Sequence, residues 1–297
     1  MADPLAWRRF WRTPAAVIAL AILIFVVVAA ILGPLFLPAS YARPSDLSFS
    51  PPTLAHPFGT DINGRDILYR VMTGGTVSLV VGCCGALVSL IIGTGYGMVA
   101  GYIGGKTDFF LMRFVDVLFS IPRLIFILIC INSFSAKLQD YAAAHGWGGI
   151  ADFSRLIVLV IALGIIEWLT LARIVRGQTL TLKSRAFVTA AKALGQSHAK
   201  ILFRHLLPNL SGIILIYLTL TIPAVVIGES FLSFLGLGIQ APQASWGSLL
   251  ADGAAALNPL KIRWWLVLFP AMAMAITLLS LNILGDAMRD ALDPRRS

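Results

Sequence analysis

Charge is scarce in this chain. Only 12% of its 297 residues are charged, whereas 58% are hydrophobic. A soluble domain usually carries about 25% charged residues, so the composition excludes an ordinary soluble domain and indicates a protein that crosses a membrane several times. The apolar runs are continuous and do not alternate in segments of about ten residues, so they predict helices rather than a β-barrel.

Six apolar runs are long enough to cross a bilayer as helices, which takes roughly 20 residues. The predicted fold is therefore all-α, with six transmembrane helices. Their predicted spans are residues 15–37, 76–102, 109–134, 156–175, 210–235 and 264–284. The glycines of the second span recur every four residues at Gly93, Gly97 and Gly101, which predicts close packing against another helix. The longest connection, residues 38–75, is expected to end in a helix along the membrane surface.

Cysteine and histidine are also scarce, with three and four residues. Cys83, Cys84 and Cys130 fall inside predicted spans at spacings that match no metal site. We therefore expect buried thiols that pack as small hydrophobic groups. His198 and His205 have no further ligands near them in the sequence, so no metal site is predicted.

The chain lacks the glycine pattern of a phosphate-binding loop. Gly105-Lys106-Thr107 ends like such a loop, but Ala100 stands where the pattern requires glycine. The segment also ends a predicted membrane span, whereas a phosphate loop follows a strand. We therefore expect a chain that does not hydrolyse ATP and has no catalytic residue and no cofactor of its own.

Acidic residues are missing between Glu167 and Glu229, where seven basic residues occur. These are Arg173, Arg176, Lys183, Arg185, Lys192, Lys200 and Arg204. Short connections rich in Lys and Arg stay in the cytoplasm. The basic amino-terminal tail is separated from this connection by an even number of spans, so both are predicted to face the cytoplasm, as is the carboxyl terminus. The net charge of +9 then reflects membrane orientation rather than nucleic-acid binding.

Part of this basic connection has the pattern of an amphipathic helix. Phe187, Ala191, Leu194 and His198 recur at helical spacing. Ala191 and Gly195 are four residues apart, and on a helix they would form a flat face that another backbone can approach closely. These residues leave two alternatives open: a docking surface for a partner protein, or a basic amphipathic helix that rests on anionic lipid.

The stretch from Thr189 to Gly195 reads TAAKALG and resembles the cytoplasmic loop of ABC importer membrane subunits. The pattern of that family is Glu-Ala-Ala, three residues, then Gly, so Thr189 stands where the family has Glu. In the family, this loop forms a coupling helix that inserts into a cleft on the ATPase subunit. The resemblance therefore implies an ATPase-docking helix over residues 187–197. Its expected residues are Phe187, Thr189, Ala190, Ala191, Leu194, Gly195 and Ser197.

Further segments are similar to the importers of dipeptides, oligopeptides and nickel. They are residues 56–70 (HPFGTDINGRDILYR), 116–122 (DVLFSIP), 229–238 (ESFLSFLGLG) with Trp246-Gly247, and 282–295 (NILGDAMRDALDPR). The first segment follows the first span, as in the second of the two different membrane subunits of those importers. The resemblance implies the type I importer fold in three parts. These are residues 1–75 (tail, first helix and external loop), 76–285 (transmembrane domain with coupling loop 176–209) and 286–297 (cytoplasmic tail).

The same resemblance implies the partners and the location. A second homologous permease subunit completes the path, two ABC ATPase subunits bind the ATP, and an extracytoplasmic binding protein delivers the substrate. The chain itself lies in the lipid bilayer of a bacterial inner (cytoplasmic) membrane. The expected substrate is a peptide or a peptide-like solute, and nickel or another small solute is the alternative. A secondary transporter is a further alternative, but it should show inverted repeats, and the sequence has no convincing internal symmetry.

Glu229 is an acidic residue in the fifth predicted span. A charge in hydrocarbon is costly, so its side chain should face protein or water. Together with Ser230 and Ser233, Glu229 is a candidate for the substrate path or its gate. The alternative is a structural carboxylate that caps backbone amides of the following loop.

Overall fold

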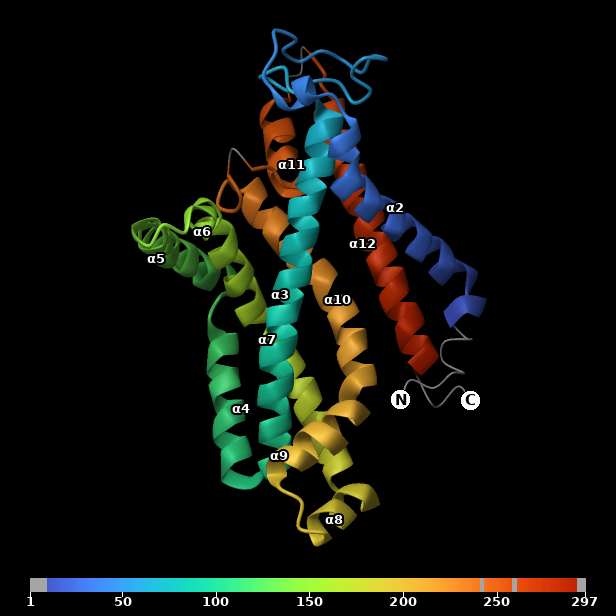
Figure 1. The fold of residues 1–297 in the computed structure, drawn as a ribbon, viewed down its shortest axis with the longest axis vertical. Coiled ribbons are helices and arrows are strands. Elements are labelled where there is room, and N and C mark those ends of the chain that lie inside the picture. The colour runs from blue at the N-terminus through green and yellow to red at the C-terminus, as the bar shows by residue number, and fades with distance from the viewer. Residues whose placement is uncertain (1–9, 241–242, 258–260, 293–297) are drawn as a thin grey trace. The chain divides into compact units, whose positions relative to one another are not determined.

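The computed structural model describes residues 10–240, 243–257 and 261–292. Within these ranges the chain is helical, and Thr60 and Asp66 form an isolated β-bridge. Figure 1 labels the helices along the chain. The longer helices are α2 (Pro14–Phe36), α3 (Ile67–Ile103), α4 (Gly105–Ser120), α5 (Arg123–Ala144), α7 (Ser154–Lys183), α10 (Leu207–Phe234) and α12 (Trp265–Leu292). The shorter ones are η1 (Ala39–Ala42), α6 (Gly148–Asp152), α8 (Ala186–Ala193), α9 (His198–Ile201), the π-helical turn η2 (Leu202–Leu206) and α11 (Trp246–Ala255).

Six helices in the described part of the chain are long and apolar enough to cross a membrane. They confirm the predicted all-α fold, and five of them overlap the predicted spans closely. The third is different: the apolar helix there is α5, Arg123–Ala144, and the prediction of one span over residues 109–134 is wrong. The chain is extended at Ile121, with φ −78° and ψ 126°, and Pro122 follows. Because proline disfavours helical geometry in the preceding residue, it separates α4 from α5 at this point.

Helix α3 starts at Ile67 and continues without interruption to Ile103. The expectation of a separate surface helix at the end of the connection 38–75 is therefore wrong, because those residues form the first turns of α3. The predicted domain boundary at residue 75 also falls inside this helix.

The chain divides into two compact units, and the division passes through α3, α10 and α12. Unit 1 contains the chain up to Thr13, Cys84–Ile222 and the residues from Gly285, and unit 2 contains Pro14–Cys83 and Pro223–Leu284. The predicted division into a first part, a transmembrane domain and a tail follows sequence position, whereas these units bring together segments that are distant in the sequence.

Within unit 1, α3 packs closely against α7 along its glycines. A Cβ atom added to Gly93 would lie 2.9 Å from the carbonyl oxygen of Trp168, and one added to Gly97 would lie 2.5 Å from that of Ala172. The next glycine in the row, Gly101, approaches the carbonyl oxygen of Arg176 at 2.8 Å by the same measure. These distances confirm the predicted close packing, since no side chain fits between the two backbones.

All three cysteines lie in the described helices α3 and α5, and no disulfide joins them. Cys130 is half-buried, but Cys83 and Cys84 are exposed on the surface of the chain. The expectation of burial is therefore wrong for these two.

Candidate functional site

The basic connection between α7 and α10 forms a short helix, α8, followed by a sharp turn. Gly195 lies just beyond this helix with a φ of +68°, a left-handed conformation that favours glycine. The amide of Gln196 donates to the carbonyl of Ala191 at 3.1 Å, and that of Gly195 donates to Lys192 at 3.0 Å. This pair of bonds is a Schellman motif, which ends a helix. The expectation of one continuous helix over residues 187–197 is therefore wrong, because α8 stops at Ala193.

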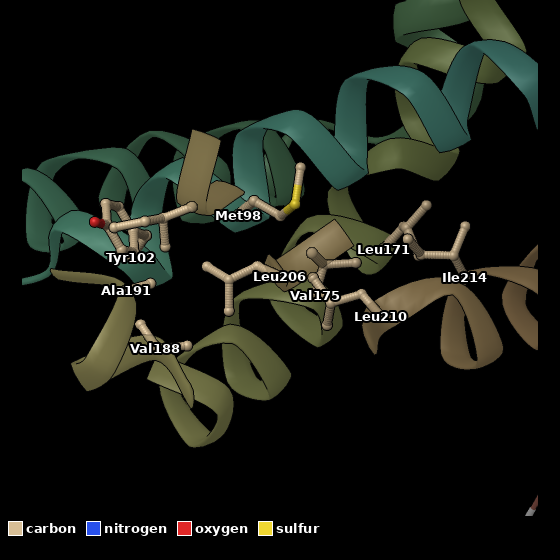
Figure 2. Packing of buried hydrophobic residues seen from close by; sticks show 10 residues of the cluster. Met98, Tyr102, Leu171, Val175, Val188, Ala191, Leu206, Leu210 and Ile214 are labelled. Atoms are coloured by element: carbon tan, nitrogen blue, oxygen red, sulfur yellow. The ribbon is translucent and has the colours of Figure 1, made fainter. Parts of the chain in front are cut away.

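One side of α8 is buried in unit 1. Val188 has no exposed surface and Ala191 is 3% exposed, and both belong to a hydrophobic cluster with Tyr102 and Leu206. Figure 2 shows Val188 and Ala191 on the side of α8 that faces Tyr102. The expectation that Ala191 and Gly195 form one exposed face is wrong, since Ala191 anchors the helix to its own subunit. The complete cluster is Met98, Tyr102, Leu171, Val175, Val188, Ala191, Ile201, Leu206, Leu210 and Ile214.

The other residues expected at the docking surface are exposed. They are Phe187, Thr189, Ala190, Leu194, Gly195 and Ser197. Leu194 stands out because 79% of its surface is exposed, which is unusual for a leucine that packs within its own chain. The exposed side of α8 and its turn thus has two large apolar side chains, Phe187 and Leu194, and its other expected residues are small or polar.

Polar contacts tie this connection to the end of α3. The hydroxyl of Tyr102 lies 2.9 Å from Nδ1 of His198, and the ammonium of Lys192 lies 5.1 Å from the centre of the Tyr102 ring. In the same connection, Nε2 of His205 lies 2.8 Å from Oε1 of Gln196. The two histidines therefore hold the connection together. The sequence reasoning did not identify Tyr102, although an aromatic residue at the end of a membrane span is a recognisable signal.

Unit 2 contains the buried carboxylate of Glu229, which has no exposed surface. Three serine hydroxyls donate to it, and Ser245 is a further hydrogen-bonding partner. Ser233 donates to Oε1 at 2.7 Å, while Ser78 and Ser230 donate to Oε2 at 3.2 and 3.3 Å. Ser78 lies far away in the sequence, on α3, and no local pattern pointed to it.

Two of these serines, Ser78 and Ser233, also accept hydrogen bonds from the backbone of the loop and helix that follow α10. The amide of Trp246 donates to the hydroxyl of Ser78 at 3.2 Å, and the amide of Ile239 donates to that of Ser233 at 3.0 Å. Glu229 therefore reaches the loop amides through serines. This arrangement agrees with the structural alternative, with hydroxyl groups between the carboxylate and the backbone.

The connection that precedes α3 is folded around Asp61, also in unit 2. The Asp61 carboxylate accepts from Nε of Arg65 at 2.8 Å and from Nη1 of Arg70 at 2.8 Å. Arg70 also bonds Asp252 of α11 at 3.1 Å, so the two connections of this unit are joined. Beside these residues lies a cleft of about 670 Å³, which Arg263 also lines.

These features define the class of protein: a polytopic helical membrane protein with an exposed short helix in one connection and folded connections in its second unit. A family model described as the inner membrane component of binding-protein-dependent transport systems matches residues 93–297. A second, described as the N-terminal transmembrane domain of oligopeptide transport permease C, matches residues 5–53.

Characterised relatives align along almost the whole chain. The oligopeptide transport system permease protein OppC of Haemophilus influenzae is 43% identical, with 98% of this chain and 88% of the relative covered. The dipeptide transport system permease protein DppC of Bacillus subtilis is 41% identical, with 98% and 85% covered. OppC of Escherichia coli is 41% identical, with 98% and 90% covered.

The chain therefore belongs to the family of inner membrane components of binding-protein-dependent transport systems. It is a permease subunit of an ABC importer and not an enzyme, and it lies in the inner membrane with several spans. Membership in this family decides against the secondary transporter.

Proposed function

We propose that this permease subunit serves an ATP-driven importer of peptides or peptide-like solutes and forms half of its translocation path. The observation that carries the proposal is the exposed side of α8 and its turn, at the position where the family's coupling segment falls. The names of the relatives, which are oligopeptide and dipeptide permeases, support the substrate class.

In this proposal, Phe187, Thr189, Ala190, Leu194, Gly195 and Ser197 form the contact surface for an ABC ATPase subunit. The ATPase pushes on the exposed side of α8, and the buried side transmits the movement. Because Val188 and Ala191 are packed with Tyr102 of α3 and Val175 of α7, a displacement of α8 also moves these two helices. Such a rigid movement of packed helices is a common way to switch a transporter between two states.

The charge distribution supports the orientation. The basic connection 176–209 faces the cytoplasm in this proposal, together with both termini. The connections 40–75 and 236–263 then lie outside, where the folded surface around Asp61 and Arg70 receives the extracytoplasmic binding protein. Two ATPase subunits and a second, homologous permease subunit complete the complex.

Glu229 has a supporting role in this proposal. Buried with Ser230 and Ser233, it holds the loop after α10 in place, so this loop moves as one body when the outer gate opens. A direct contact between the carboxylate and substrate would require the surrounding serines to separate.

The experiment is co-purification of the ATPase subunits with the tagged permease pair, combined with peptide uptake into proteoliposomes that contain the binding protein. Leu194→Asp places a charge on the docking surface and is expected to abolish ATPase association, while membrane insertion persists. Leu54→Asp is the matched control for ATPase association alone, because Leu54 is fully exposed in the connection before α3, on the opposite side of the membrane in this proposal. Retention of the ATPase by the Leu194 variant would contradict the docking assignment. Uptake of nickel without uptake of peptides would support the alternative substrate.

A further inference from the structure

An ion pair lies at the break between α4 and α5. Nη2 of Arg123, the first residue of α5, is 2.6 Å from Oε1 of Glu167 on α7. Both residues belong to unit 1. Arg123 is the only charged residue between Asp116 and Lys137, and Glu167 is the only one between Arg155 and Arg173.

Glu167 lies within an apolar segment of α7. In the proposed topology the cytoplasmic connection begins at residue 176, nine residues after Glu167, which corresponds to about 14 Å along a helix. This places the Glu167 carboxylate, with the guanidinium that contacts it, within a hydrocarbon layer about 30 Å thick. Ionised side chains at such a depth face protein or a water-filled path rather than lipid.

The pair lines a cleft of about 330 Å³. Its wall includes Ser120, Phe126 and Thr170 besides the two charged residues, and the remainder is apolar. This volume is at the lower end of the range of small-ligand sites, which is roughly 300–1,000 Å³. The cleft is thus suited to a molecule the size of a short peptide.

A single contact between one nitrogen and one oxygen joins the two side chains of this ion pair. The side chain of Arg123 is 41% exposed and that of Glu167 is 15% exposed, and they meet through Nη2 and Oε1. Arg176, in contrast, donates to both carboxylate oxygens of Asp108, from Nε to Oδ1 at 2.5 Å and from Nη2 to Oδ2 at 2.6 Å. A bidentate contact of that kind is strong and has fixed geometry. The single contact at the helix break is easier to exchange for other charged partners, and both of its side chains line the cleft.

We propose that this cleft is a substrate subsite in which Arg123 takes the carboxylate of a zwitterionic peptide and Glu167 takes its ammonium group. The inference rests on the proposed function and adds the chemistry of recognition. A zwitterion replaces the contact between the two side chains with two new charged contacts. The net charge of the cleft stays at zero, so no unpaired charge is left inside the membrane. A singly charged solute would leave one member of the pair without a partner.

The experiment measures how peptides protect the cleft from chemical labelling in the complete importer complex, held in lipid nanodiscs. A reporter cysteine replaces Thr170, and the native cysteines Cys83, Cys84 and Cys130 become serine. A water-soluble maleimide is then reacted with the complex. The dipeptide Ala-Ala is expected to slow this reaction in a saturable way. N-acetyl-Ala-Ala and Ala-Ala-amide are expected to bind about tenfold more weakly, because each has lost one charged group.

Two variants test which side chain binds which end of the peptide. Arg123→Gln is expected to remove the difference between Ala-Ala and its amide, while Glu167→Gln removes the difference between Ala-Ala and its acetyl form. Arg123→Lys keeps the charge and is expected to keep the preference for the free acid. Lys137→Gln and Asp140→Asn are matched controls that remove one exposed charge each from α5 and leave the preferences unchanged.

Three outcomes would overturn the inference: no labelling of Thr170→Cys in any nucleotide state, no protection by Ala-Ala, or equal protection by free and capped dipeptides. The first would mean that the cleft is packed against the second permease subunit. If the glutamine variants do not assemble, the comparison of free and capped peptides on the reporter with both charges in place decides the matter. Loss of ATPase association in the unmodified complex would instead refute the proposed function, so the two failures are distinct.

Discussion

Gly195 offers the sharpest test of how α8 is terminated. Its φ of +68° lies in the left-handed region, and a Cβ atom added there would meet no atom within 4 Å. A substitution therefore changes the backbone preference without creating a clash inside the subunit. For a residue with a Cβ atom, the left-handed conformation costs roughly 1–2 kcal/mol. Asparagine tolerates it better, because its short polar side chain can bond locally.

The expected order of coupling is wild type, then Gly195→Asn, then Gly195→Ala, with Gly195→Val the weakest. A cost of 1–2 kcal/mol lowers the fraction of correctly formed turn relative to other turns by a factor of about 5–30. The β-branched side chain of valine is least compatible with this conformation. Peptide uptake per ATP hydrolysed is the measured quantity, with ATPase co-purification and the amount of inserted subunit as controls.

Backbone conformation and contact with the ATPase predict different rankings. If the turn geometry decides, the asparagine variant outperforms the alanine variant although its side chain is larger. If coupling instead falls with side-chain volume, the left-handed conformation is not the reason for glycine here. Coupling at the wild-type level in all three variants would refute the assignment of this turn to the docking surface.

Three further substitutions test the contacts around the two candidate regions. Tyr102→Phe removes the bond to His198 and is expected to cost about 1 kcal/mol; a lower uptake per ATP with an assembled complex would show it, and unchanged coupling would speak against this link. Glu229→Ala leaves the buried serine hydroxyls without their acceptor and is expected to lower the unfolding free energy by about 3 kcal/mol, whereas Glu229→Gln keeps one acceptor and costs less. Thermal unfolding in detergent compares the two variants, and equal midpoints would contradict the hydrogen-bond explanation. Arg70→Ala breaks the contacts of Arg70 with Asp61 and Asp252, so half-maximal uptake is expected to need about tenfold more binding protein. If that binding-protein concentration is unchanged, these connections do not dock the binding protein.

Sequence patterns predicted most of the long helices and one close contact between helices. Long apolar runs located five of the six membrane-spanning helices, because a chain in hydrocarbon must satisfy its own backbone hydrogen bonds. The glycine row of α3 likewise predicted a close helix contact, since side-chain size alone limits how near two backbones can come. The third helix was misplaced because a hydropathy pattern does not show where a helix is interrupted. Residues 109–134 are apolar on both sides of Pro122, where α4 and α5 are separated.

The candidate site was only partly predictable. The exposure of Leu194 follows from its position beyond the end of α8, but the burial of Ala191 depends on Tyr102, almost ninety residues earlier in the chain. The serine that completes the surroundings of Glu229, Ser78, is equally remote. Sequence spacing on one helix shows which residues share a face and leaves open what that face packs against.

The sequence by itself determined that this protein crosses a membrane and which connection is basic, because both depend on composition. Only the tertiary structure decided that α8 has its Ala191 side buried and its Leu194 end exposed, and that Arg123 meets Glu167 at the break between α4 and α5. Those outcomes depend on contacts between distant segments. The packing of α7 beside α5 selects which charges become partners, and no local pattern carries that information.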